Sequence, residues 1–424
     1  MKTPWNDSAL IDAFDADFSA LVEFASASAC PAGFGYLDAD GAITESKGVE
    51  LWITCRMTYM FALAEMRGVQ GVSGLVEHGL DALSTSLHDD EYGGWFSALD
   101  ATGEQARPVE PIRKEAYAHA FVILATAASY LAGHERGRAL LDEALADQDA
   151  HWWEPSYGRV ANSWNRDWSE CEEYRGLNAN MHTVEAYLAA FDATGERRWL
   201  DRAREMMRFV ADLGARFGWR LPEHFDKNWV VCPEMFIENP ADPFRPYGAT
   251  PGHGFEWARL ILHGRASLIA CGDTPGEWMY DVAHCLVDRA DADGWDSEKG
   301  GIVYTTDFDG KTVVDTRMHW VACEAVNATL ALGKVSEELG NDDDVMVQSE
   351  RFARYVAWAD QVIHAGPGRW IHEVDADGHE SETVWAGKAD AYHVGQMLLL
   401  PRIGLYPGFA AALAQVRAHD HSEL

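Results

Sequence analysis

Apolar residues recur at helical spacing along almost the whole chain, and the helical runs come in pairs. We predict amphipathic helices near residues 8–29, 48–68, 71–87, 112–132, 135–146, 178–194, 197–214, 254–272, 275–290, 318–334, 346–363, 388–400 and 406–417. The joints within pairs are short, at 68–71, 132–135, 192–196 and 272–277. Short joints favour antiparallel helical hairpins. The pattern therefore predicts an all-α protein.

Stretches rich in Gly, Asp and aromatic residues separate the helix pairs and repeat one plan. GFGYLDADG (33–41), YGGWFSALDATG (92–103), KGGIVYTTDFDG (299–310) and RWIHEVDADG (369–378) each lead from a strand-like segment into an Asp-Gly or Asp-x-x-Gly turn. Such turns suit tight β-hairpins. Repeating units of this size form a solenoid or a closed ring. We predict one (α/α)6 barrel over residues 1–424, with short β-hairpins between the helix pairs; the linker-like stretch 336–350 falls inside a predicted pair.

Composition and charge exclude several classes of partner. The net charge of −34 argues against nucleic acid and anionic membrane surfaces, because both are bound through clustered Lys and Arg. The acidic start is unlike a signal peptide, and no run of about 18 apolar residues predicts a membrane span. Seven scattered cysteines without a CxxC pair indicate a reduced, cytoplasmic protein without structural zinc.

Polar side chains form stripes on two predicted helices. Asn178, His182 and Glu185 recur at i, i+4 and i+7, which is one face of a helix. Trp52 and Arg56 share a similar face on an otherwise apolar helix. An Arg there needs a carboxylate or a ligand oxygen, because an unpaired buried charge is costly. A hydrogen-bonded polar pair in the core remains an alternative for the Asn and His.

Two further histidines stand near helix starts. His253 lies between two glycines with Glu256 three positions on, and His393 follows Trp385 and Tyr392. Each histidine alone is more often structural than catalytic, but three in separate helix pairs of one ring are expected to face its axis. Other candidates for the cavity wall are Tyr117, His119, Arg317, His319, Trp320, Glu324, Lys388 and Asp390.

This set of aromatic, planar polar and imidazole groups is typical of a sugar-binding cavity. The sequence shows no Gly-rich phosphate loop and no dinucleotide fingerprint. The two His-x-x-Glu pairs lack the companions of a known metal motif. We therefore expect no cofactor and no metal, with imidazole as the acid–base group that titrates near neutral pH.

Six segments resemble the N-acylglucosamine 2-epimerase superfamily: ELWITCR, KEAYAHAF, NANMHTVEA, GHGFEWARL, RMHWVACEA and WAGKADAYH. They occur in family order, and the similarity spans about residues 33–401. It is strongest to the aldose–ketose isomerase branch, which includes mannose and sulfoquinovose isomerases. His319 departs from the pattern, since many relatives carry an aromatic residue there, and Ala389 has no clear counterpart.

The resemblance implies an (α/α)6 barrel and metal-free interconversion of free sugars, foremost D-mannose and D-fructose, through an enediol. It assigns His253 and His393 to acid–base catalysis, with His182 as a third catalytic-pocket histidine. Arg56 then holds the substrate oxygens. The implied substrate-binding positions are Arg56, Trp52, Tyr117, Asn178, Glu256, Trp320 and Trp385.

From these positions we expect Glu256 to fix the ring of His253, and the flanking glycines to make room for the sugar. The alternatives are a 2-epimerase of glucose/mannose-type or N-acyl sugars, a sulfoquinovose isomerase, an (α/α)6 glycoside hydrolase and a non-catalytic sugar-binding module. A hydrolase needs paired carboxylates, whereas the predicted inner faces carry histidines. The expected partner is a small sugar, bound by a monomer or homodimer.

Overall fold

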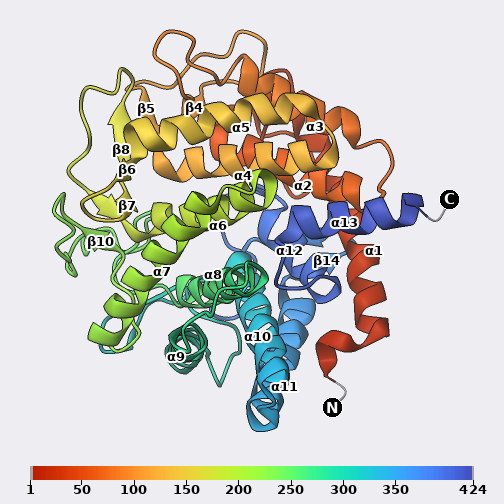
Figure 1. The fold of residues 1–424 in the computed structure, drawn as a ribbon, viewed down its shortest axis with the longest axis vertical. Helices are drawn as coiled ribbons and strands as arrows, with labels where there is room; N and C mark the ends of the chain where they lie inside the picture. The colour runs from red at the N-terminus through yellow and green to blue at the C-terminus, as the bar shows by residue number, and fades with distance from the viewer. Residues whose placement is uncertain (1–2, 423–424) are drawn as a thin grey trace.

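Two concentric rings of helices make up the molecule (Figure 1). The computed structural model describes residues 3–422. The inner ring contains α2 (Leu51–Met66), α4 (Ala116–Ala132), α6 (Leu177–Thr194), α8 (Pro251–Ala270), α10 (His319–Leu339) and α12 (Tyr392–Leu399). The outer ring contains α1 (Ser8–Ala25), α3 (Ser73–Ser84), α5 (Glu135–Asp147), α7 (Arg197–Arg216), α9 (Trp278–Gly294) and α11 (Asp342–Trp358).

Neighbouring inner helices pack in chain order, and α12 closes the ring against α2. The outer helices α3, α5, α7, α9 and α11 each pack on the inner helix before them, while α1 packs on α12. This arrangement is the predicted (α/α)6 barrel. The last helix, α13 (Phe409–Ser422), belongs to neither ring and lies against α2, α4 and α6.

Burial explains which helices take the inner positions. In α2 all residues but Glu65 are buried, so this helix is surrounded by protein on every side. In α7, by contrast, charged residues occupy one face, and Trp199, Leu200, Ala203, Met206 and Val210 are buried on the other. A helix that is apolar all round belongs inside, and a strongly amphipathic one belongs at the surface.

Short antiparallel strand pairs occupy the loops at one end of the barrel. The pairs are β1 (Ala29–Cys30) with β2 (Gly33–Phe34), β3 (Val49–Glu50) with β4 (Ala98–Leu99), β5 (Arg113–Glu115) with β8 (Ser163–Asn165), β6 (Trp153–Glu154) with β7 (Arg159–Val160), β9 (Arg175–Gly176) with β10 (His224–Phe225), β11 (Thr305–Thr306) with β12 (Thr312–Val314), β13 (Arg317–Met318) with β16 (Glu373–Val374), and β14 (His364–Gly366) with β15 (Arg369–Trp370). Single-turn elements add 3-10 turns at Pro4–Asn6, Ser26–Ser28, Glu45–Lys47 and Leu400–Arg402, and π turns at Gln148–Trp152 and Ala359–Ile363.

Three of the four predicted Asp-Gly turns are confirmed; at the fourth, residues 100–103, the Asp100 N–H instead donates to the Arg107 carbonyl at 2.8 Å. Asp307 and Gly310 form the turn between β11 and β12, where the Gly310 N–H donates to the Asp307 carbonyl at 3.1 Å. Gly41 and Gly378 donate in the same way to the carbonyls of Asp38 and Asp375, at 3.2 and 3.1 Å. All three glycines have φ near +85°, a conformation that side chains with a Cβ rarely adopt.

A repeated ion pair ties loops to the starts of inner helices. Lys114, Arg175 and Arg317 each stand two residues before an inner helix. They pair with Asp89 at 3.2 Å, Glu154 at 2.7 Å and Asp296 at 2.6 Å.

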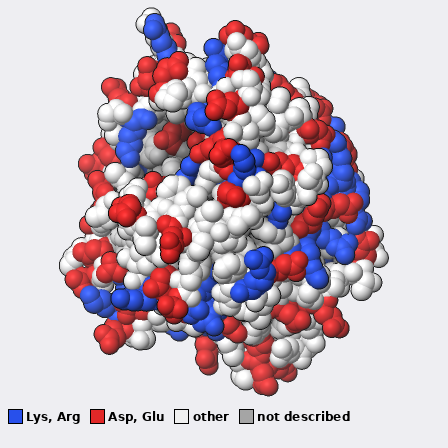
Figure 2. All heavy atoms as spheres, turned by 90° about the vertical axis from the view of Figure 1, so that its left-hand side faces the viewer, with Lys and Arg blue, Asp and Glu red and all other residues white. Residues whose placement is uncertain are grey.

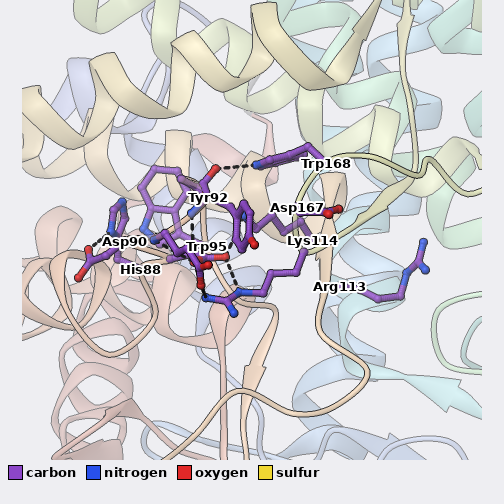
Figure 3. A network of polar contacts seen from close by, with 12 residues as sticks. His88, Asp90, Tyr92, Trp95, Arg113, Lys114, Asp167 and Trp168 are labelled. Carbon is purple, nitrogen blue, oxygen red and sulfur yellow. Dashed lines mark hydrogen bonds and ion pairs between the residues drawn. The ribbon is translucent and has the colours of Figure 1, made fainter.

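Figure 3 shows Lys114 within its network. There the Trp168 indole N–H donates to the Tyr92 carbonyl at 2.9 Å, and Arg166 forms two hydrogen bonds to Asp89 at 2.9 and 3.0 Å. The side chains of Lys114 and Asp89 are fully buried. The ion pair therefore fixes the loop against the helix that follows it.

The face that carries β5–β8 and β10, on the left of Figure 1, is turned to the viewer in Figure 2. Acidic side chains are spread over this face and basic ones lie among them (Figure 2). Among residues 3–422, none of the helices combines the length and the apolar character that a membrane crossing requires.

Candidate active site

The second residue of an inner helix recurs as a cavity-lining position. Each of these residues lies where a short strand or loop turns into the first turn of its helix. Five of the six inner helices contribute this residue to one cavity: Trp52, Tyr117, Asn178, Trp320 and His393. On α8 the equivalent residue is Gly252, and His253 lines the cavity instead. The repeated helix pairs of the barrel thus bring residues from equivalent helix positions to one cavity.

The cavity lies at the end of the barrel where the inner helices begin. It brings together every site residue that the sequence predicted: Trp52, Arg56, Tyr117, Asn178, His182, His253, Glu256, Trp320, Trp385 and His393. The remaining lining residues are Pro243, Phe244, Tyr304, His319, His372, Ala389 and Asp390.

Two histidines in this cavity have the same hydrogen-bonding arrangement. His253 Nδ1 lies 2.9 Å from Glu223 Oε1, and His393 Nδ1 lies 3.0 Å from Glu324 Oε1. An ionised carboxylate can only accept a hydrogen bond, so each Nδ1 is the donor. A neutral imidazole then carries its free lone pair on Nε2. In both rings Nε2 is therefore the atom that can take up or release a proton.

The expectation that Glu256 holds the His253 ring is wrong, because Glu223 does so. Glu223 lies in the long loop between α7 and α8, where no helical periodicity marks it. Although Glu256 shares a helix with His253, its Oε1 lies instead 3.7 Å from His182 Nδ1.

The glycine before His253 makes room for a tryptophan rather than for a sugar. A Cβ on Gly252 would lie 2.5 Å from Cζ3 of Trp320, which is far inside van der Waals contact. The Trp320 ring lies 5.2 Å from that of His253 and 5.8 Å from that of His393, centroid to centroid. Gly254 faces the other way, where a Cβ would meet Ala290 of α9 at 3.3 Å. Gly252 therefore allows Trp320 to pack beside both histidines.

Arg56 has the partner that its burial requires. Its Nη1 donates to Asp390 Oδ2 at 2.9 Å, and its Nη2 donates to the Tyr117 hydroxyl at 3.0 Å. The guanidinium also lies 4.3 Å from the Phe121 ring and 4.5 Å from the Tyr392 ring. Burial favours the neutral acid, but Arg56 outweighs it and keeps the pKa of Asp390 below its ordinary value. The cavity wall thus holds a charged, fixed guanidinium.

Four lining residues carry buried polar atoms that have no hydrogen-bond partner among the described residues: Arg56 Nε, Asn178 Oδ1, His182 Nδ1 and both carboxylate oxygens of Glu256. Burial lowers the pKa of His182 to about 4. Burial, together with the nearby Glu324, raises the pKa of Glu256 well above its ordinary value. His182 is therefore neutral near pH 7, and the surroundings of Glu256 disfavour its charged form. Buried polar groups are normally satisfied, so these atoms indicate a polyhydroxylated ligand.

Burial and the cation of Arg56 lower the pKa of His393 well below its ordinary value. The ring is therefore unprotonated at neutral pH, as a general base must be. His319 lies close by, with its Nδ1 3.1 Å from the His372 carbonyl and its ring stacked on His372 at 3.8 Å. The imidazole of His319 thus occupies a place in the wall beside His393.

Four of the wider candidates do not line the cavity. One of them, Glu324, lies behind His393 as the acceptor of its Nδ1–H. His119 accepts the Trp95 N–H at 3.2 Å, Arg317 pairs with Asp296, and Lys388 donates to the Trp370 carbonyl at 2.8 Å. These side chains support loops near the site.

Sequence reasoning missed an aromatic residue at the cavity mouth. The Phe244 ring lies 6.0 Å from Trp52, 5.5 Å from Tyr117 and 5.2 Å from Trp385, centroid to centroid. The Tyr304 hydroxyl holds this loop by donating to the Pro243 carbonyl at 3.2 Å. The loop has no repeat and no helical period, so only the fold reveals the contact.

The chain is similar to known proteins along most of its length. The model of the N-acylglucosamine 2-epimerase (GlcNAc 2-epimerase) family matches residues 33–397. The D-mannose isomerase of Thermobifida fusca is 43% identical over 411 residues, which cover 95% of this chain and 96% of that protein. The D-mannose isomerase of Pseudomonas cannabina pv. alisalensis is 40% identical over 397 residues, or 93% of each chain.

The fold agrees as well. A crystal structure of a D-mannose isomerase superposes with a TM-score of 0.83 at 24% identity, covering 95% of this chain and 99% of that one. With the family model extending over most of the barrel, this chain belongs to the N-acylglucosamine 2-epimerase family.

Proposed function

We propose that this protein is an aldose–ketose isomerase that interconverts D-mannose and D-fructose. One observation carries the proposal: His253 and His393 line the same cavity as Arg56, and each histidine has its Nδ1 on a carboxylate. The two relatives named as D-mannose isomerases, at 43% and 40% identity, support the choice of sugar.

His393 is the group that moves the carbon-bound proton. In the open-chain aldose its Nε2 takes the proton from C2, and the electron pair of that bond forms the C1–C2 double bond of the enediol. The carbonyl oxygen O1 gains a proton as its π bond opens. His393 then returns the proton to C1, O2 loses its proton, and the ketose carbonyl forms at C2. The lowered pKa of His393 suits the first step.

His253 and Arg56 act on the oxygens. His253, with Nδ1 held by Glu223, exchanges a proton with the ring oxygen when the sugar opens and closes. The Arg56 guanidinium stabilises negative charge on the enediolate oxygens, because it is already oriented by Asp390 before the charge develops.

The other lining residues bind the sugar. Asn178, His182 and Glu256 offer polar atoms that have no hydrogen-bond partner within residues 3–422, and each fits a sugar hydroxyl. Trp52 and Trp385, with ring centroids 5.9 Å apart, supply apolar surface for the C–H face of the ring.

A 2-epimerase is the second candidate. It would use the same two histidines, because epimerisation returns the proton to the opposite face of C2. The observation that favours it is the pair of imidazoles, both with Nε2 free, placed beside the same Trp320 ring.

One experiment separates the candidates. The protein is incubated with D-mannose in deuterium oxide and followed by NMR. We expect fructose carrying deuterium at C1 from partial exchange of the shuttled proton, and activity within about a factor of two after EDTA treatment. Glucose deuterated at C2, without fructose, would make the protein an epimerase. No conversion would reject both.

The same proposal includes the organisation of the protein. Buried apolar residues from Trp5 to Leu413 form one core cluster, which supports a single catalytic domain that works as a monomer or homodimer. All seven cysteines are unpaired, which supports a reducing cytoplasmic location.

A further inference from the structure

A buried arginine lies directly below the catalytic cavity. Arg259 is on α8, two helical turns after Gly252, and its side chain is 1% exposed. Its Nε donates to Glu324 Oε2 at 2.8 Å, and its Nη2 donates to Glu324 Oε1 at 3.3 Å. Glu324 is itself fully buried, and its Oε1 receives the hydrogen bond from His393. Arg259, Glu324 and His393 thus form one chain of contacts.

Two further carboxylates face the same guanidinium. Nη2 lies 3.6 Å from Glu256 Oε1, and Nη1 lies 3.7 Å from Glu185 Oε1. Burial disfavours the cation, but the three glutamates outweigh it and raise the pKa of Arg259 well above its ordinary value. The guanidinium is therefore a permanent positive charge among three buried acids.

The acids around Arg259 also have the spacing of metal ligands. His182, Glu185 and Glu256 form one group of donor atoms that lie within 4.8 Å of one another, and Glu256, Glu324 and His393 form another. Glu256 belongs to both groups. A cluster of oxygen and imidazole donors without a cation would be unstable. Arg259 supplies the positive charge that such donors otherwise take from a divalent ion.

We propose that Arg259 is a positioning residue that acts as the built-in cation of the site: it clamps Glu324, and Glu324 in turn fixes the His393 ring. The role rests on the proposed isomerase reaction. Two hydrogen bonds to one carboxylate fix its plane. Glu324 Oε1 is then aimed at His393 Nδ1, which leaves Nε2 directed at the substrate. A metal ion in this place would bind Glu324 and so compete with the His393 Nδ1–H for that carboxylate.

The position of Arg259 separates its effect from substrate binding. The residue is not among those that line the sugar cavity; it lines a second cavity on the opposite side, toward α13. A change at Arg259 should therefore lower kcat, which depends on His393, by much more than it raises KM for mannose, to which Arg259 is linked only through its 3.6 Å contact with Glu256.

The first test is kinetic and uses three variants. Arg259→Met removes the charge and should lower kcat by about 10²-fold or more, with KM changed by less than about threefold. Arg259→Lys keeps the charge but loses the two-pronged contact, and should recover part of the lost rate. Arg265→Met is the matched control: Arg265 lies on the same helix and makes a similar two-pronged pair with Glu338, at 2.9 and 3.1 Å, away from the cavity. It should retain wild-type kcat.

The second test does not depend on the reaction. In Arg259→Ala the acids lose their cation and are left with space, so 1 mM Mn²⁺ should raise the melting temperature by about 2 °C or more. Wild type and Arg265→Ala should show no such shift. If Arg259→Ala does not fold without the metal, folding rescued by Mn²⁺ gives the same support, and no rescue counts against the proposal.

Three results would overturn the inference: wild-type kcat in Arg259→Met, a rise in KM alone, or no response of Arg259→Ala to Mn²⁺. Failure of the proposed function looks different. In that case the wild-type protein itself would not convert mannose, while the melting experiment would still report on the charge of the cluster.

Discussion

The two histidines proposed as acid–base groups, His253 and His393, differ in what surrounds their carboxylate partners. Glu324, the partner of His393, is clamped by Arg259 inside the barrel. Glu223, the partner of His253, comes from a loop and has no such clamp among the hydrogen bonds of the described residues. The His393 ring is thus held by the rigid barrel, and the His253 ring by a loop. A rigidly held His393 suits a base that must reach one carbon atom of the substrate. A loop-held His253 suits an acid that must stay in contact with the sugar as its ring opens.

Replacing Glu223 by Gln should lower kcat on mannose by about 10²-fold, because the amide carries no negative charge and its NH2 can donate to Nδ1, which allows the other tautomer of the His253 ring. Exchange of the C2 proton with solvent deuterium should continue for an open-chain substrate, since His393 is intact. His253→Ala should behave alike, whereas His393→Ala should abolish exchange and turnover together, at a cost of about 10²–10⁴ in kcat.

The control for this comparison is Glu234→Gln, an exposed glutamate in the same loop, which should retain wild-type kcat. Wild-type turnover in Glu223→Gln would show that the contact with His253 plays no part in the chemistry. Unfolding of both His→Ala variants would instead identify the histidines as core residues.

The pH dependence of the reaction follows from the environment of His393. Its imidazole is buried, and the cation of Arg56 opposes its protonation more than Asp390 favours it. His393 therefore stays neutral and active as the pH falls through 6.5, the ordinary pKa of histidine. We expect kcat/KM to be level from pH 8 to about 6.5 and to fall only below that range. A rate profile with its acid limb centred above pH 6.5 would contradict this.

At the scale of elements, the ion pairs that precede inner helices determine where those helices begin. Lys114, Arg175 and Arg317 occupy the same place in three repeats, although their acidic partners come from different loops. The second residue of each following helix lines the cavity. A shift in such a loop would therefore move Tyr117 or Asn178 directly.

Asp89→Asn tests the contribution of the buried pair. The substitution leaves the fully buried Lys114 without its anion, and an uncompensated buried charge costs about 3–5 kcal/mol. We expect the free energy of unfolding, measured in urea, to fall by that amount. The control is Asp90→Asn, whose side chain is 91% exposed and pairs with His88; it should cost less than about 1 kcal/mol. Equal effects at both positions would show that burial of the pair is not what matters.

Helix pairing could be predicted from the sequence because the inner and outer helices differ in apolar content and because short joints leave few arrangements. The residues at which the helices begin and end could be predicted less well than the pairing of the helices. The predicted helix at 388–400 begins only at Tyr392, since Asp390 lies before it and accepts the Tyr392 N–H at 2.8 Å. The stretch 336–350 forms the end of α10 and the start of α11, with two residues between them.

At the scale of the whole molecule, some residues of the site could be predicted from the sequence and others could not. Arg56, His182 and Glu256 lie on helical stripes, so their convergence follows from the ring of helices. Glu223 and Phe244 lie in the long α7–α8 loop, and their contacts with His253 and Trp52 depend on how that loop folds back. The spacing of apolar residues along the chain does not predict how a loop folds back onto the barrel. The expectation that Gly252 makes room for the sugar was wrong for a related reason: Trp320, for which it does make room, is remote in the sequence.

The C-terminal helix α13 lies across the end of the barrel opposite the mouth, and Phe409 lines the cavity on that side. Among the described residues, α13 therefore covers the end of the barrel opposite the sugar cavity, which leaves the end where the inner helices begin as the entrance for the sugar. A sugar that has reacted must leave by the route through which the next one arrives, so aldose and ketose exclude each other. Fructose should then act as a competitive inhibitor of mannose turnover. In a cell, the net direction of the conversion would depend on which of the two sugars other reactions consume faster.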